Sequence, residues 1–174
     1  MQIRTRSKIV HGVALAAGAT LALVACSKPK PAGPPPAPPA TGAPIVFQVT
    51  KVTPGDKHNG VLTVRAYNFS VKPVAGYGIK YRFKDQAGAR IQLNVGTAFE
   101  RDFDSWSMQG PDMLCKPKSW CGFEIDHLNV PVNAANADVI ADSVRAIAPD
   151  GVKFEPDAIW ELSGSHTEWP ASMP

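Results

Sequence analysis

Apolar and polar residues alternate along the chain from Ile45 onward. The clearest runs are Leu62–Ala66, Ile79–Phe83, Ile91–Val95 and Phe123–Ile125, in which every second residue is apolar. A period of two places one side-chain face on a core and the other in water, which is typical of a half-buried β-strand. The pattern therefore predicts strands rather than helices over most of the chain.

Turn residues separate these runs. Pro54-Gly55-Asp56, Asp85-Gln86-Ala87-Gly88 and Pro149-Asp150-Gly151 each contain the glycine that tight turns favour. The predicted strands are 45–53, 60–70, 75–84, 89–95, 99–108, 120–130, 138–148 and 152–162. Short strands at this spacing, with no convincing helix, predict an all-β domain built as a β-sandwich over residues 45–174. The expected core residues are Ile79, Tyr81, Phe83, Ile91, Leu93, Phe123 and Ile125.

The first 25 residues have a different pattern. Arg4, Arg6 and Lys8 give a positive start, and residues 9–25 form an uncharged, mostly apolar run when His11 is neutral. This arrangement is typical of a secretory signal peptide. A short membrane anchor is the alternative, since 17 residues are at the lower limit for spanning a bilayer.

The end of this run is more specific. Leu23-Val24-Ala25-Cys26 resembles the lipobox of bacterial lipoproteins, in which a branched residue and a small residue precede an obligatory cysteine. The resemblance implies that residues 1–25 are removed and that Cys26 carries a diacylglycerol thioether and usually a third, palmitate-type acyl chain. It also implies a membrane anchor. In Gram-negative lipoproteins an Asp after the cysteine commonly retains the protein at the inner membrane, so Ser27 implies the outer membrane.

Residues 26–44 are expected to form a disordered linker after the lipidated cysteine. Eight of the 17 prolines of the chain lie here, and large apolar residues are absent. Such a segment cannot form a core and favours the extended polyproline II conformation. It is interpreted as a semi-rigid stalk of at most roughly 55 Å. A Pro-rich ligand for an aromatic groove is the functional alternative.

The formal charge of +3 disappears when the leader is removed. The remaining chain has 15 basic and 15 acidic residues, and Lys28 and Lys30 lie in the linker, so the domain has a net charge of −2. This balance argues against nucleic acid as a partner.

A second resemblance concerns the middle of the domain. Tyr67-Asn68-Phe69-Ser70 with Pro73, and Tyr81-Arg82-Phe83 with Asp85 and Gly88, are similar to the central hairpins of immunoglobulin-like domains in bacterial envelope lipoproteins. The resemblance implies an immunoglobulin-like β-sandwich. The distant inter-sheet cysteine pair of antibody domains is absent, because Cys115 and Cys121 are close in sequence.

The number of cysteines is consistent with export of the protein from the cytoplasm. If Cys26 carries lipid, Cys115 and Cys121 remain as a pair for a disulfide in an oxidising compartment. A redox or metal pair is the alternative, but the Cys-x-x-Cys spacing is missing and only His127 lies nearby.

The loop from Met108 to Gly122 is the predicted contact surface. Lys116, Lys118 and Trp120 lie between the two cysteines, so a stiff loop would present two positive charges and an aromatic ring. An anionic surface polymer or an acidic patch of an envelope protein is the expected partner. Burial of Trp120 in the core is the alternative.

Other constellations favour structural roles. Glu100, Asp102 and Asp104 would share one face of a strand, where solvent rather than calcium is the expected neighbour. His127 has the parity of Phe123 and Ile125 and is therefore predicted to lie in the core. The sequence predicts no metal site and no cofactor.

Motifs of enzymes are missing as well. Gly-x-Ser-x-Gly, His-Glu-x-x-His, the Walker loop and the dinucleotide fingerprint do not occur. We therefore expect a non-enzymatic, lipid-anchored envelope protein that acts as an interaction module. A small periplasmic hydrolase or metal-carrier lipoprotein is the alternative function.

Overall fold

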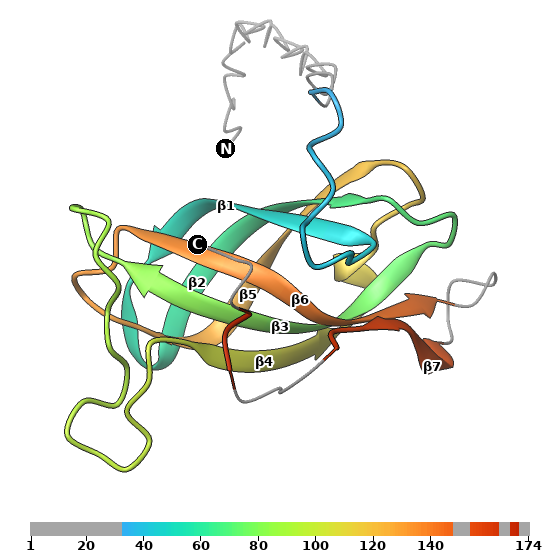
Figure 1. Cartoon of the computed structure of the whole chain (residues 1–174). Coiled ribbons are helices and arrows are strands. Elements are labelled where there is room, and N and C mark those ends of the chain that lie inside the picture. The colour runs from blue at the N-terminus through green and yellow to red at the C-terminus, as the bar shows by residue number, and fades with distance from the viewer. Residues whose placement is uncertain (1–32, 148–153, 164–167, 171–174) are drawn as a thin grey trace, which may run out of the picture. The chain divides into compact units, whose positions relative to one another are not determined.

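In the computed structural model, residues 33–147, 154–163 and 168–170 are described, without the side chains of 147 and 154–157. This part of the chain is all β apart from one short 3-10 helix (Figure 1). The elements are β1 (Ile45–Thr53), β2 (Gly55–Asn68), β3 (Val74–Lys84), β4 (Asp104–Gln109), η1 (Pro111–Met113), β5 (Trp120–Val130), β6 (Asn136–Ile147) and β7 (Phe154–Glu161). The predicted leader, Cys26 and the turn at Pro149-Asp150-Gly151 lie outside the described residues.

The strands form two antiparallel sheets. One sheet has the order β1-β2-β5, and the other has the order β4-β3-β6-β7. Consecutive strands β2 and β3 thus belong to different sheets, as do β4 and β5. The all-β fold class with two packed sheets is confirmed, because period-two strands must cover their apolar faces with a second layer.

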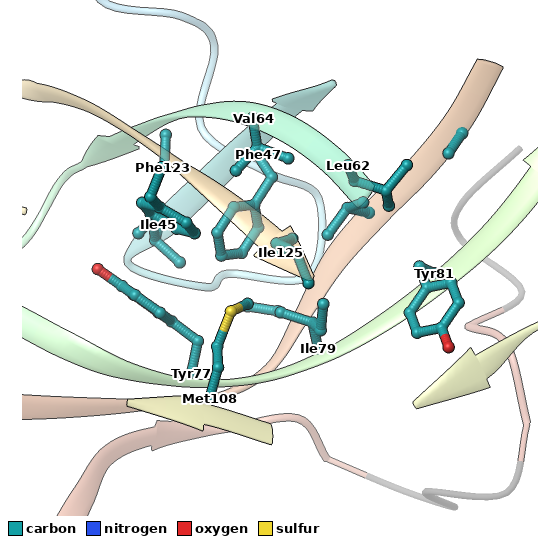
Figure 2. Packing of buried hydrophobic residues seen from close by; sticks show 14 of the residues in the cluster. Ile45, Phe47, Leu62, Val64, Tyr77, Ile79, Tyr81, Met108, Phe123 and Ile125 are labelled. Atoms are coloured by element: carbon teal, nitrogen blue, oxygen red, sulfur yellow. The ribbon is translucent and has the colours of Figure 1, made fainter. Parts of the chain in front are cut away.

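The core lies between the two sheets and is formed by the inward-facing residues of the strands (Figure 2). Tyr77 of β3 stacks on Phe123 of β5, with ring centroids 5.5 Å apart, and Phe47 of β1 meets both rings edge-on. The predicted register is confirmed, since Ile79, Tyr81, Phe83, Phe123 and Ile125 are buried. Ile91 and Leu93 are half-buried and pack against this cluster.

The prediction of a strand over 89–95 is wrong. Asp85–Gly88 does form a turn, in which the N–H of Gly88 donates to the Asp85 carbonyl. Only the isolated bridges Lys84↔Arg90 and Leu93↔Arg101 follow it, and the chain continues as a long loop before β4 (the green loop in Figure 1). Alternation alone does not form a strand, because a strand also needs a neighbour for its hydrogen bonds.

The predicted strand 99–108 begins only at Asp104. Glu100, Asp102 and Asp104 therefore do not share a strand face. Each carboxylate has a partner of its own: the Gly96 N–H for Glu100, Arg90 at 3.3 Å for Asp102, and Arg101 for Asp104. Local hydrogen bonds and ion pairs thus separate the three charges.

His127 is exposed, which contradicts its prediction as a core residue. Its φ is 57°, in the left-handed region, and the pairing of β5 with β2 shifts between Ile125 and Leu128. This β-bulge inserts one residue and reverses the alternation, so Leu128 is buried and His127 faces solvent.

Candidate binding surfaces

The disulfide loop lies at one end of the sandwich and connects its two sheets. Cys115 and Cys121 are joined in a disulfide, with Cα atoms 5.2 Å apart. Cys115 also exchanges two backbone hydrogen bonds with Val74, the first residue of β3, whereas Cys121 belongs to β5. A bond between residues close in sequence therefore still ties one sheet to the other, which the cysteine spacing alone does not reveal. Closing so short a loop is worth roughly 2 kcal/mol by chain entropy.

The backbone of this loop is fixed by hydrogen bonds to the last two residues of β2. The Asn68 N–H donates to the Ser119 carbonyl at 3.1 Å, and the buried Asn68 amide donates to the Cys115 carbonyl at 3.1 Å. Tyr67 donates its hydroxyl proton to the Lys118 carbonyl at 3.1 Å. The loop is consequently held by β2 as well as by its disulfide.

The three predicted contact residues do not lie on one common tip. Lys116 and Lys118 are exposed, and the ammonium group of Lys118 donates to the Phe69 carbonyl. Trp120 is the first residue of β5 and is half-buried on the outer face of the three-stranded sheet, opposite Tyr67 in the register. Trp120 is thus neither a core residue nor a freely exposed one.

Two side chains of β2 pack against the Trp120 ring. The Arg65 guanidinium carbon lies 4.2 Å from its centroid, and the Tyr67 ring centroid lies 5.4 Å away. Tyr67 in turn packs edge-on against Phe69, at 4.8 Å. We name Arg65, Tyr67, Phe69 and Trp120 the tryptophan patch. It combines aromatic faces with a cation, an arrangement that suits extended peptides and other flat or anionic groups.

No protein-family model matches the chain, and no curated protein matches it. Among solved structures, the chain is similar to the Salmonella enterica trimeric lipoprotein SadB, with 13% sequence identity and a TM-score of 0.37. The similarity covers 56% of this chain and 48% of that chain, so it spans about half the length of SadB. This neighbour is a bacterial lipoprotein.

A second feature, which the sequence did not indicate, is a hollow of about 790 Å³. The β1–β2 turn, the long β3–β4 connection and the segment after β5 line it, through residues that include Asp56, Lys57, Leu93, Asp104 and Val132. Val95 and Val132 expose 69% and 90% of their surface here. The hollow offers two carboxylates, one ammonium and apolar walls, which is a mixture that suits a small polar ligand.

A third feature is the outer face of β3, where Lys80 and Arg82 are fully buried. The C-terminal segment 168–170 covers them: Lys80 donates to the Glu168 carbonyl at 2.6 Å, and the Arg82 guanidinium lies 4.1 Å from the Trp169 ring centroid. The Nε of Arg82 donates to Asp138 at 2.9 Å, but its two terminal nitrogens have no hydrogen-bond partner within the described residues. Alternation alone assigned these positions to solvent.

Titratable groups in the core are tyrosines. Burial raises the pKa of Tyr77 above its ordinary value, and burial followed by the neighbouring Asp104 carboxylate raises the pKa of Tyr81. Both hydroxyls are thereby kept neutral. Among the described residues no group of three His, Cys, Asp or Glu side chains has the geometry to hold a metal ion. None of the described residues forms a helix long and apolar enough to cross a membrane.

Proposed function

We propose that this chain is a non-enzymatic lipoprotein of a bacterial envelope whose β-sandwich binds an envelope partner. The sequence Leu23-Val24-Ala25-Cys26, followed by a Pro-rich segment and then by a folded β domain, supports the anchor. Two or three acyl chains on Cys26 hold a protein stably, since each buried CH₂ contributes about 0.8 kcal/mol. The domain then needs no apolar face of its own for membrane attachment.

The strand order supports an immunoglobulin-like assignment of the domain. Pairing of β2 with β5 in one sheet and of β3 with β6 in the other is the arrangement of B with E and C with F in immunoglobulin sandwiches. Ser27 after the cysteine supports transfer of the lipoprotein to the outer membrane.

The binding role is proposed for the disulfide loop. The observation that carries it is the exposure of Lys116 and Lys118 on a loop whose backbone is fixed by the disulfide and by β2. Because little conformational entropy remains to be lost, a preorganised loop of this kind gains affinity on docking. The two ammonium groups of this loop favour an anionic polymer or an acidic protein surface as partner.

The anchor is tested by the variant Cys26→Ala. We expect mass spectrometry of the wild-type protein from membranes to show an N-terminal, triacylated Cys26, and the variant to lack lipid and retain its leader or lose it elsewhere. An unmodified Cys26 in the wild-type protein would contradict the proposal. Replacement of Ser27 by Asp should move the protein to the inner-membrane fraction.

The loop is tested on an immobilised polyanion, with neutral dextran as the blank matrix. We expect Lys116→Ala/Lys118→Ala to elute at lower salt than the wild-type chain, because each lost contact removes one screened attraction. The matched control is Lys51→Ala/Lys57→Ala, which removes two exposed lysines from β1 and the start of β2. Equal shifts in both variants would show that only net charge matters and would refute a loop-specific site.

A further inference from the structure

The Pro-rich segment is not separate from the domain over its described part. Residues 33–44 have no strand or helix, yet the Trp120 indole N–H donates to the Gly33 carbonyl at 3.0 Å. At the other end the Phe69 N–H donates to the Pro44 carbonyl at 2.7 Å, and Ala43 belongs to the core. Both ends of the segment are thus attached to the folded domain.

The exposure of the prolines between these ends has a period of three. Pro36 and Pro39 are half-buried, whereas Pro34, Pro35 and Pro38 are exposed. The polyproline II conformation that prolines favour has three residues per turn, which would place Pro36 and Pro39 on one face. Pro36 and Pro39 are thus the prolines of this segment that are partly covered, and the Gly33 carbonyl at its start is held by the Trp120 indole. A turn follows these prolines, in which the Gly42 N–H donates to the Pro39 carbonyl and Gly42 adopts a φ of 74°.

The tryptophan patch has the chemistry that such a helix requires. Polyproline II carbonyls have no partner within their own segment, and proline has no N–H to offer. A receptor must therefore supply donors and flat apolar faces, and Trp120 supplies both. Arg65 and Tyr67 pack on the indole from β2, so side chains of the sheet position its ring. The spacing Pro36-x-x-Pro39 is the one that aromatic grooves select in Pro-rich ligands.

We propose that the tryptophan patch is a polyproline-binding site and that its occupant is residues 33–39 of the same chain. Docking would also set how far the domain can lie from the membrane anchor, because it shortens the free part of the connection between Cys26 and the domain, here called the tether. This extension rests on the proposed lipidation of Cys26. With the segment docked, six residues, 27–32, would separate the anchor from the domain, and a chain of this length reaches at most roughly 20 Å. Release as far as Gly42 lengthens this connection to roughly 50 Å. The patch thereby holds the domain near the membrane surface or lets it extend.

The docking is tested without any lipid, on the full-length chain in detergent micelles with ¹⁵N-labelled tryptophan. The variant Trp120→Phe identifies the Trp120 indole signal by its loss. We expect Pro36→Ser/Pro39→Ser to shift this signal and to speed its exchange with water by about tenfold or more, since a free indole N–H loses its acceptor. The matched control is Pro35→Ser/Pro38→Ser, which removes two exposed prolines and the same amount of chain stiffness; it should leave the signal unchanged.

Three outcomes would overturn this site. The first is an equal effect of the two double variants, and the second is no effect of either. The third is a signal that depends on protein concentration, which would place the segment of a second copy on the patch. Unchanged melting temperatures of the variants separate undocking from unfolding.

The change in reach is tested on lipidated protein in vesicles, by energy transfer from a dye on the domain to acceptor lipids. We expect Pro36→Ser/Pro39→Ser to lower the transfer about twofold or more relative to Pro35→Ser/Pro38→Ser. Equal transfer would refute the tether role. The indole experiment needs neither lipid nor partner. Its result therefore stands even if Cys26 carries no lipid, and failure of the docking proposal can be told apart from failure of the lipoprotein proposal.

Discussion

The protonation state of a single residue in this domain can depend on its neighbours. Tyr81 is one example, because its ring lies in the core while its hydroxyl meets the Asp104 carboxylate. A phenol in this position is stable only in its protonated form, since ionisation would place a second negative charge beside the first in a poorly hydrated site. The residue therefore couples the core to the pH of the solvent.

This coupling predicts an alkaline loss of stability. The pKa of Tyr81 is raised in the folded protein above its ordinary value of 10.0, so its contribution is complete below pH 10 and declines as the pH rises above this value. We expect the free energy of unfolding in urea to fall more steeply for the wild type than for Tyr81→Phe as the pH rises above about 10, the ordinary tyrosine pKa. Parallel curves for the two proteins would contradict the assigned burial of the hydroxyl.

At the scale of elements, strand β5 shows how one inserted residue reverses the alternation of buried and exposed side chains in the rest of a strand. The bulge at His127 ends the parity that Phe123 and Ile125 establish and transfers the inward position to Leu128. The backbone N–H of His58 in β2 donates to the Asn129 side chain at 2.8 Å, next to this irregular pairing. Side-chain contacts of this kind stabilise a bulge and cannot be read from alternation.

The bulge predicts that substitution of Leu128 destabilises the domain and substitution of His127 does not, which is the opposite of what uninterrupted alternation predicts. Leu128→Ala should cost about 2–4 kcal/mol of unfolding free energy, because it opens a cavity in the core. His127→Asn should change stability by less than about 0.5 kcal/mol, because His127 is exposed and asparagine tolerates a positive φ. Urea unfolding followed by circular dichroism measures both. The reverse order of effects would show that the period-two register continues to the end of β5.

At the scale of the described domain, both outer sheet faces carry irregular segments. The Gly33 carbonyl accepts a hydrogen bond from Trp120 of the tryptophan patch on the three-stranded sheet, and residues 168–170 cover Lys80 and Arg82 of β3. Residues 168–170 exclude water from the Arg82 guanidinium. Its partner is Asp138, and Asp138 also accepts from Lys84. Removal of a cover from a buried ion pair changes its hydration as well as its packing.

The C-terminal cover predicts a difference between two substitutions of Trp169. Trp169→Ala should lower the free energy of unfolding by about 2 kcal/mol, because it removes the ring over Arg82 and its contact with Phe103. Trp169→Phe keeps a ring and removes an indole N–H that has no acceptor within the described residues, so its cost should stay below about 1 kcal/mol. Urea unfolding provides the comparison, and equal losses would assign the effect to the indole rather than to the cover.

Much of the fold was predictable from the sequence. The boundaries of β1 and β5 agree with the predicted ranges 45–53 and 120–130, and the core faces of β3 and β5 were assigned correctly up to Ile125. This part succeeded because a period of two and turn residues are local properties of the chain. The pairing of Cys115 with Cys121 agrees with the expectation from their number and spacing.

The tertiary structure decided what depends on distant neighbours. It moved residues 89–95 out of the sheet, buried Lys80 and Arg82 under the C-terminal segment, and placed Trp120 between Arg65 and the Gly33 carbonyl. Nothing within a few residues of these positions encodes the outcome, because a strand needs a partner for its hydrogen bonds and a charge is buried only where another segment covers it. The sequence by itself determined the period of the strands and the composition of the Pro-rich segment; which surfaces these elements meet was decided by contacts between residues far apart in the chain.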